Sequence, residues 1–271
     1  MTIKPPPRIL PELPDIALSC DGILNRQYHL YQPKQGYRFG TDAIMLAAAV
    51  GSHYGTRIAD FGAGVGAVTT ALCHFLDSAH VTAIEKDPEM AACLQHNMAL
   101  NHLEDRVRVM KNDVTSLPSL LQDSFDCVVA NPPFHHASGT RSRHHRRALA
   151  HQGDEANLTD WVNAALDLLK PKGHFVMIVR ADRTDEVISA LKDKKAGQIT
   201  LQPLWPYGSS PAIRVIISAQ KQSKAPFAIL QGLVLHHPDG MPTARAAQIL
   251  NGDAAGALAM TDKNDDNIKG R

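Results

Sequence analysis

The chain has 271 residues, of which 44% are hydrophobic, and a formal net charge of +1. This length fits one large or two small domains, and the apolar fraction is that of a globular protein with a proper core. The near-zero charge excludes a molecule-wide electrostatic attraction to nucleic acid, so a nucleic-acid partner would need a local basic patch.

Cysteine spacing and hydropathy restrict the setting in which the chain works. Four cysteines lie far apart, without a Cys-x-x-Cys pair: Cys20, Cys73, Cys93 and Cys127. This spacing argues against a disulfide framework or a zinc site and suits a reducing compartment. No apolar stretch reaches the roughly 20 residues that span a bilayer, and the N-terminus lacks the apolar block of a secretory signal. We therefore expect a cytoplasmic protein that does not enter a membrane.

The two ends of the chain differ in composition from its middle. Residues 1–20 begin with a proline-rich run and are expected to form an extended lead. Residues 253–271 carry few large apolar side chains and cannot bury enough surface to offset the entropy of ordering. We therefore predict a disordered tail there and one domain over residues 21–252.

Within this domain, strand-like and helix-like patterns alternate. Continuously apolar runs, typical of strands buried on both faces, cover residues 58–61, 81–84, 107–110, 125–130 and 175–179. Amphipathic helical patterns cover residues 68–76, 87–98, 158–169 and 182–195, the second opened by an Asp-Pro pair and the third stopped at residues 170–173. Strand-like segments 198–202, 212–219 and 229–236 follow with short connectors. The alternation predicts an α/β domain with a mostly parallel sheet covered on both faces and antiparallel pairing at its C-terminal edge.

A glycine-rich loop follows the first of these strands. The run from Asp60 to Ala67 places Gly62, Gly64 and Gly66 between a strand and a helix. Glycines there let the backbone turn tightly and approach a ligand closely. Because the run satisfies both the G-x-G-x-x-G/A dinucleotide fingerprint and the tighter G-x-G-x-G form, it predicts a nucleotide site without choosing the nucleotide.

Acidic residues at the ends of the strands help to identify the nucleotide. Glu85 ends the second strand, where a carboxylate can accept hydrogen bonds from both ribose hydroxyls of an adenosine. Lys86, the next residue, is a further candidate for the nucleotide site. Asp113 ends the third strand and is placed to contact an adenine amine, although a turn residue is the alternative. Asp60 stands directly before the glycines, where it would repel the pyrophosphate of a dinucleotide.

The strand over residues 125–130 runs directly into Asn131-Pro132-Pro133-Phe134. The prolines restrict the residue ahead of them, so Asn131 is held at the carboxyl edge of the sheet, where open α/β sheets bind ligands. A conjugated exocyclic amine is a poor nucleophile because its lone pair is delocalised. The Asn131 side-chain oxygen and the Pro132 carbonyl can each accept one N–H bond of such an amine and favour a more nucleophilic geometry. Phe134 offers a flat face on which a base can stack.

In this arrangement the chain resembles class I S-adenosylmethionine-dependent methyltransferases. Asp60 with its glycines, Glu85 and Asp113 are similar to the successive cofactor motifs of that class, in which the first acid lies near the methionyl amino group. Residues 131–134 resemble the Asn-Pro-Pro-Tyr/Phe motif of amino-methyltransferases acting on adenine N6, guanine N2 or a glutamine amide. The resemblance implies S-adenosylmethionine as cofactor and a Rossmann-like, doubly wound α/β fold with a mostly parallel seven-stranded sheet and an antiparallel C-terminal edge.

A narrower resemblance is to the bacterial tRNA(Val) adenine-N6 methyltransferase family. Residues 37–47 are similar to the Gly-Thr-Asp segment that closes over the cofactor in that family, and we expect Thr41 or Asp42 to cap a short helix there. Residues 232–246 are similar to the family's C-terminal end. The likeness covers about residues 22–250, is weaker beyond Arg180 and departs at Phe134, where the family commonly has tyrosine. It implies methylation of adenine N6 in RNA, with tRNA as the substrate class.

The loop after the motif, residues 135–156, is rich in histidine and arginine. Between positions 135 and 151 it has five histidines, no acid and four arginines: Arg141, Arg143, Arg146 and Arg147. Beside the active site, this loop predicts a phosphate-binding surface for RNA, with a solvated flexible loop as the alternative. The arginines would repel a cation, so no metal is expected.

Other functions stay open on the sequence. A glutamine methyltransferase or a guanine-N2 methyltransferase would use the same motif, but a protein amide needs no phosphate contacts. A NAD-dependent oxidoreductase or a catalytically silent cofactor-binding module would keep the glycine loop. The sequence predicts no oligomeric state.

Overall fold

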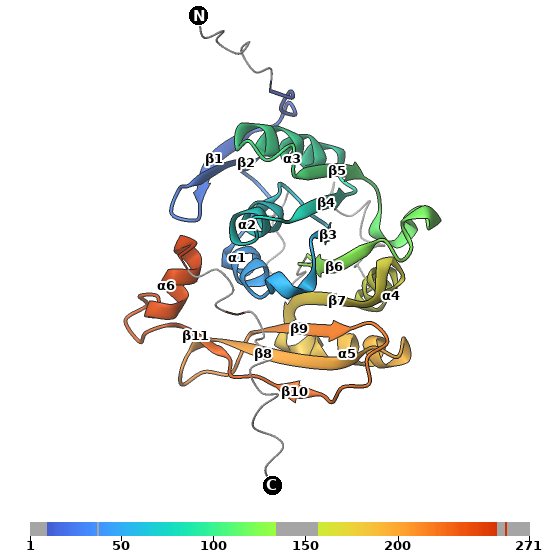
Figure 1. Cartoon of the computed structure of the whole chain (residues 1–271). Coiled ribbons are helices and arrows are strands. Elements are labelled where there is room, and N and C mark those ends of the chain that lie inside the picture. Colours follow the sequence, from blue (N-terminus) through green and yellow to red (C-terminus); the bar gives the residue numbers. More distant parts are fainter. Residues whose placement is uncertain (1–9, 37, 134–156, 254–257, 259–271) are drawn as a thin grey trace, which may run out of the picture.

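The computed structural model describes residues 10–36, 38–133, 157–253 and 258. A mostly parallel sheet lies at the centre, with helices α1 and α2 on one face and α4 and α5 on the other (Figure 1). Neighbouring strand residues face opposite sides, so that Ile58 packs in one hydrophobic cluster and Ala59 in the other. The two clusters confirm a sheet that is covered on both faces. Among the described residues, no helix has the length and apolar character to cross a bilayer.

The sheet has nine strands among the described residues. Their order is β5–β4–β3–β6–β7–β9–β8–β10, and β11 pairs with β8 as well. Their bounds are Arg57–Phe61 (β3), His80–Glu85 (β4), Val107–Lys111 (β5), Phe125–Ala130 (β6), Leu169–Arg180 (β7), Gly197–Tyr207 (β8), Arg214–Gln220 (β9), Ala228–Ile229 (β10) and Leu233–His236 (β11). The strand order reverses direction between β3 and β6, and ligands of open α/β sheets bind at such a switch point.

The predicted α/β fold with a mostly parallel sheet is confirmed. The predicted segments from 58–61 to 212–219 correspond to β3 to β9. The predicted segment 229–236 forms two short strands parallel to β8, β10 and β11, so the sheet has nine described strands where seven were expected. The antiparallel strand is β9, which lies between β7 and β8 rather than at the edge. Residues 208–213 between β8 and β9 are too few for the crossover that parallel pairing requires, so the chain turns straight back.

The helices follow the predicted amphipathic patterns. Their bounds are Thr41–Ala48 (α1), Ala67–Phe75 (α2), Pro88–Leu100 (α3), Leu158–Leu168 (α4), Thr184–Asp193 (α5) and Ala244–Asn251 (α6). Short 3-10 turns lie at Ser52–Tyr54, Val114–Ser116, Ser119–Leu121 and Ala181–Arg183. The predicted start of α3 is confirmed, because the Asp87 carboxylate accepts hydrogen bonds from the backbone N–H groups of Glu89 and Met90.

The predicted end of the helix before residues 170–173 is confirmed to within one residue, but these residues belong to a strand, whereas the sequence predicted that the next strand begins at residue 175. Helix α4 ends at Leu168 and β7 begins at the next residue, which pairs with Phe125 of β6. The register then shifts between Phe125 and Cys127, and Lys172 has a φ of +67°. These residues therefore form an irregular first part of β7, which tertiary pairing holds despite its proline.

A hairpin of β1 (Leu18–Ile23) and β2 (Tyr28–Pro33) precedes the main sheet. The sequence did not predict it, and the expected boundary between lead and domain at residue 20 falls inside β1. At the other end, Leu258 of the predicted tail is only 1% exposed and packs in the core, whereas the tail otherwise lies outside the described residues except for Asp253. Three of the four cysteines, Cys73, Cys93 and Cys127, are buried, whereas Cys20 is exposed.

Two asparagines of α3 join the hairpin to that helix. The Asn97 side chain accepts a hydrogen bond from the Tyr31 N–H at 2.7 Å and donates to the carbonyls of Tyr31 and Val65, each at 2.9 Å. One turn later, Asn101 makes the same pair of bonds with His29, at 2.9 and 2.8 Å. These amides bond β2 as a third strand would, and Asn97 also reaches the glycine loop.

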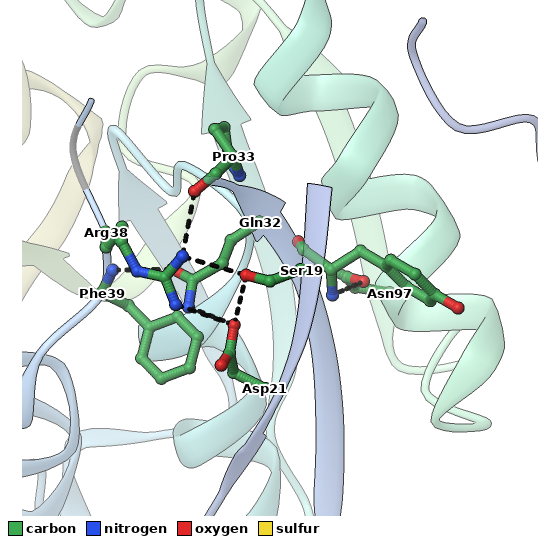
Figure 2. A network of polar contacts seen from close by, with 8 residues as sticks. Ser19, Asp21, Gln32, Pro33, Arg38, Phe39 and Asn97 are labelled. Carbon is green, nitrogen blue, oxygen red and sulfur yellow. Dashed lines mark hydrogen bonds and ion pairs between the residues drawn. The ribbon is translucent and has the colours of Figure 1, made fainter. Parts of the chain in front are cut away.

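The hairpin is tied to the segment before α1 as well (Figure 2). Arg38 donates hydrogen bonds to Ser19 Oγ and the Pro33 carbonyl and forms an ion pair with Asp21 at 2.9 Å. Hydrogen bonds from Ser19 and Gln32 hold the pKa of Asp21 below its ordinary value, and Arg38 adds to this effect. The chain entering α1 is therefore fixed on the hairpin.

We expect Asn97→Ala to lower the free energy of unfolding by on the order of 3 kcal/mol, because it leaves the buried Val65 carbonyl and the half-buried backbone groups of Tyr31 without partners. Asn101→Ala is the matched control, since its contacts with β2 are exposed, and should cost about 1 kcal/mol or less. Urea unfolding of both variants measures the difference. Equal losses would show that the buried amide has no special part in the fold.

Candidate active site

Site residues gather at the carboxyl ends of neighbouring strands. Asp60 lies in β3, Glu85 ends β4, and Asn131 directly follows β6. Because β4, β3 and β6 are adjacent and parallel, these three positions share one edge of the sheet. Asp113 follows β5, the next strand out. The arrangement brings the predicted acids and the Asn-Pro-Pro corner around the switch point.

The three glycines of the loop have different tasks. Gly62, Gly64 and Gly66 have φ values of +65°, +55° and +96°, which side chains rarely adopt. A Cβ at Gly62 would lie 2.6 Å from the Trp161 ring, and one at Gly66 would lie 2.5 Å from Leu94 Cδ1. A Cβ at Gly64 would meet nothing within 4 Å. Two glycines therefore let α4 and α3 pack closely, and the third borders open space that a ligand can fill.

Glu85 fixes this loop in place. Its Oε2 accepts a hydrogen bond from the Gly64 N–H at 2.7 Å, and its Oε1 accepts one from the Asp87 N–H at 2.8 Å. The Ala63 N–H donates to the Ile84 carbonyl at 3.0 Å beside it. The carboxylate is 8% exposed and keeps unused lone pairs on both oxygens. It can therefore hold the loop and still accept from ribose hydroxyls, as the sequence predicts.

Asp60 is a buried carboxyl group. It is 1% exposed and accepts a hydrogen bond from Thr69 Oγ1 at 2.6 Å. Burial raises its pKa to about 7, and the nearby charge of Glu85 acts in the same direction. No ion pair reaches Asp60 within the described part of the chain. A cationic ligand group would therefore stabilise its ionised form, which fits the methionyl ammonium of S-adenosylmethionine.

Asp113 is partly engaged by its own turn. Its Oδ1 accepts from the Thr115 N–H at 2.9 Å and from Thr115 Oγ1 at 2.7 Å, and these bonds lower its pKa. Its Oδ2 lies 3.9 Å from Lys86 Nζ. The structure thus brings Lys86 and Asp113 together, and one carboxylate oxygen stays available for the predicted contact with an adenine amine.

Asn131 carries an unsatisfied buried acceptor. Its Oδ1 is buried, and no donor among the described residues bonds to it. The next residue, Pro132, is buried, whereas Pro133 is exposed. A buried amide oxygen without a partner costs about 1–3 kcal/mol. A ligand N–H group at this corner would remove that cost.

The predicted cap of α1 is wrong. Gly40 is the N-cap, in an extended conformation and without a side-chain cap, and Thr41 begins the helix. The Asp42 carboxylate instead accepts a hydrogen bond from Arg214 Nε of β9 at 2.8 Å. The Asp42 carboxylate thus pairs with Arg214 and makes no cap hydrogen bond to the helix backbone. The structure therefore ties Asp42 to β9 rather than to the acids at the ends of β3, β4 and β5.

Sequence reasoning missed Thr69, Trp161 and Asn97, which act on the site through Asp60, Gly62 and Val65 respectively. The spacing of these residues in the sequence does not indicate these contacts. Phe134 and the arginines at 141, 143, 146 and 147 lie outside the described residues. Among the residues that are described, no three His, Cys, Asp or Glu side chains form a group that could hold a metal ion.

Comparison with known proteins gives the family of this chain. The sequence model of the family described as "Methyltransferase small domain" matches residues 38–194, more than half of the chain. The tRNA1(Val) (adenine(37)-N6)-methyltransferase of Bacteroides thetaiotaomicron is 29% identical over 169 residues, which are 62% of this chain and 70% of that protein.

Two solved structures share the fold. A predicted O-methyltransferase from Agrobacterium tumefaciens is 26% identical with a TM-score of 0.65, covering 79% of this chain and 97% of that one. TYW2 of M. jannaschii, in complex with AdoMet, is 14% identical with a TM-score of 0.54 and covers 77% of this chain and 88% of its own. The family match, with these folds and a site that fits the cofactor, shows that the chain belongs to the methyltransferase small domain family and is an S-adenosylmethionine-dependent methyltransferase.

Proposed function

We propose that this enzyme methylates the exocyclic N6 amine of an adenine in RNA, with tRNA as the RNA class. The unsatisfied, buried Oδ1 of Asn131 is the observation that carries the proposal, because it lies beside the cofactor loop and needs an N–H donor. The name of the relative from Bacteroides thetaiotaomicron, a tRNA adenine-N6 methyltransferase, supports adenine as the target.

The proposed chemistry needs acceptors rather than a strong base. S-adenosylmethionine supplies, when bound, a sulfonium methyl group that an amine lone pair can attack. Asn131 Oδ1 and the Pro132 carbonyl accept the two N–H bonds of the target amine and hold its lone pair towards the cofactor side. These acceptors also stabilise the positive charge that develops on nitrogen. As the new N–C bond forms, the bond between the methyl group and sulfur breaks and its electron pair stays on sulfur, which becomes a neutral thioether. The surplus proton then leaves the nitrogen to water.

The cofactor contacts follow from the same edge. We assign Glu85 to the ribose hydroxyls, Asp60 to the methionyl ammonium and Asp113 to the adenine amine. Gly64 borders the space that the cofactor would fill. The basic loop, residues 135–156, lies outside the described residues, and we assign it to the RNA phosphates because of its four arginines.

Asn131→Ala should lower turnover on the order of 100-fold or more, because it removes an acceptor aimed at developing charge. Cofactor affinity should stay within a few-fold of the wild type. Incubation with tritiated cofactor and total small RNA, followed by nucleoside analysis, measures turnover and identifies the product, and calorimetry measures affinity.

Asn101→Ala makes the same change far from β6 and should keep turnover. A large loss of cofactor affinity in Asn131→Ala would mean that the residue is structural, and label in protein amides instead of RNA would refute the proposed substrate.

Cofactor affinity should depend on pH through Asp60. Below about pH 7 the free enzyme holds a proton on this carboxyl, which binding of an ammonium group must release. Affinity of the wild type should therefore rise by up to about tenfold per pH unit as pH approaches 7 and then level off, whereas Asp60→Asn should be weaker and nearly independent of pH in this range.

Stability of the free enzyme gives the control for this experiment. Because the folded state raises the pKa of Asp60, it binds the proton more tightly than the unfolded chain does. The free energy of unfolding should fall as pH rises from about 4 to about 7, and Asp60→Asn should remove that fall. A pH-dependent stability together with a pH-independent cofactor affinity would show that Asp60 does not face the ammonium.

Replacing Arg143, Arg146 and Arg147 together with glutamine should weaken RNA binding and reduce the salt slope by about 0.7–0.9 for each phosphate that the loop no longer neutralises. Lys192, Lys194 and Lys195 at the end of α5 are the matched control, since they lie at the opposite edge of the sheet from Asn131. Fluorescence anisotropy across a series of salt concentrations measures both slopes. An unchanged slope in the arginine variant would remove the loop from the RNA site.

A further inference from the structure

A cavity lies on the same edge of the sheet as the active site, at the carboxyl end of β8. It has a volume of about 520 Å³ and is bounded by the end of β8, the turn after it, and the segment that ends β11. Its lining includes Tyr207, Ser209, Ser210, Val234, His236 and His237. We call it the Tyr207 pocket. Its volume lies in the range of about 300–1,000 Å³ that is typical of small-ligand pockets.

The Tyr207 pocket offers an aromatic surface. Tyr207 is 40% exposed, and its ring centroid lies 5.9 Å from that of His236, with the two planes inclined at 45°. Other exposed apolar side chains nearby in sequence are Ile213 at 49% and Met241 at 63%. Exposed rings beside apolar side chains are the usual platform on which an unstacked base lies.

Polar groups in the same pocket can read the edge of such a base. His236 Nδ1 lies 3.3 Å from the Pro206 carbonyl, which can only accept, so Nδ1 is the donor of this contact, and in the neutral imidazole Nε2 is then an acceptor. The hydroxyls of Ser209 and Ser210 can donate and accept. The described lining contains no lysine or arginine. This chemistry favours a neutral base over a phosphate group.

The position of the pocket suits a nucleotide of the same RNA. β8 is parallel to β7, so its carboxyl end lies at the sheet edge that carries Asn131. Three strand intervals separate β6 from β8, which is about 14 Å across the sheet. The glycine loop lies on the other side of β6, since β3 is its neighbour there. The Asn131 corner therefore lies between the cofactor loop and the Tyr207 pocket.

We infer that the Tyr207 pocket binds an unpaired base of the RNA substrate other than the target adenine. The inference rests on the proposed function, because it requires RNA at the Asn131 corner. The Tyr207 ring stacks on the base, while His236 and the serine hydroxyls contact its edge. Anchoring a second base fixes the RNA strand at two points, the target adenine and the base in the pocket, and gives the enzyme a preference among RNA sequences.

Tyr207→Ala tests this subsite. Loss of one base-stacking ring should raise the KM for RNA by roughly 5- to 150-fold. The kcat at saturating RNA and the affinity for S-adenosylmethionine should stay near the wild-type values. Tyr207→Phe keeps the ring and should retain a KM within a few-fold of the wild type. A short oligonucleotide that carries only the target adenine and its immediate neighbours should be methylated equally by all three proteins.

Phe227→Ala is the matched control. Phe227 is an aromatic residue of similar exposure, 46%, directly before β10. β10 pairs with Thr200 and Leu201, towards the other end of β8, so this variant should leave the KM for RNA unchanged.

The outcomes separate this inference from the proposed function. If the wild type methylates no RNA, both the proposed function and the proposed base-binding subsite are refuted. If the wild type methylates RNA and Tyr207→Ala does so with an unchanged KM, the subsite alone is refuted. An equal rise of the KM for RNA in Tyr207→Ala and Tyr207→Phe would show a contact with the hydroxyl group instead of stacking and would overturn the inference. A rise of the KM for a protein substrate but not for RNA would overturn it as well.

Discussion

The hydrogen bond from the Gly64 N–H to Glu85 sets the geometry of the site. It joins the loop after β3 to the end of β4, and the other oxygen of the same carboxylate holds the start of α3. Bonds between an ionised carboxylate and backbone N–H groups are stronger than neutral ones, so one side chain can fix two loops. With the loop fixed, Gly64 faces open space, and the loop, Asp60 and Asn131 share one edge of the sheet. The fold therefore uses an acid of the predicted ribose site to build that site.

The site also contains groups that the protein alone leaves unfavourable. Asp60 is a carboxyl group whose pKa burial raises to about 7, and Asn131 presents a buried oxygen without a donor in the described chain. Among the described residues, no cation pairs with the Asp60 carboxyl group and no N–H group bonds to Asn131 Oδ1. An S-adenosylmethionine ammonium is such a cation, and an adenine amine carries such N–H groups. Polar groups that are costly in the free protein become sources of binding energy and specificity when a matching ligand arrives.

Local patterns predicted a large part of this structure. The strand over 125–130 matches β6 residue for residue, and the Asp87 cap and the glycine loop lie where the sequence places them. These features depend on hydrogen bonds and backbone preferences of residues close in sequence. Features that depend on distant partners were missed or misplaced. They are the hairpin that Asn97 holds, the irregular start of β7, and the cap of α1, where Asp42 pairs with Arg214 instead. Each of these features depends on contacts between side chains that are far apart in sequence, and the hydrophobic periodicity of the sequence does not indicate such contacts.

The reversal of β9 has an effect on how such an enzyme can diversify. Because β9 runs back between β7 and β8, the connector over residues 208–213 and the strand ends that it joins project from the sheet edge that also carries Asn131. This connector is a surface turn, and its sequence can change without altering strand register or the cofactor loop. The cofactor loop and Asn131 thus lie on one half of the sheet edge, and the variable connector lies on the other half. Substrate selectivity can therefore evolve at the connector while the chemistry stays the same.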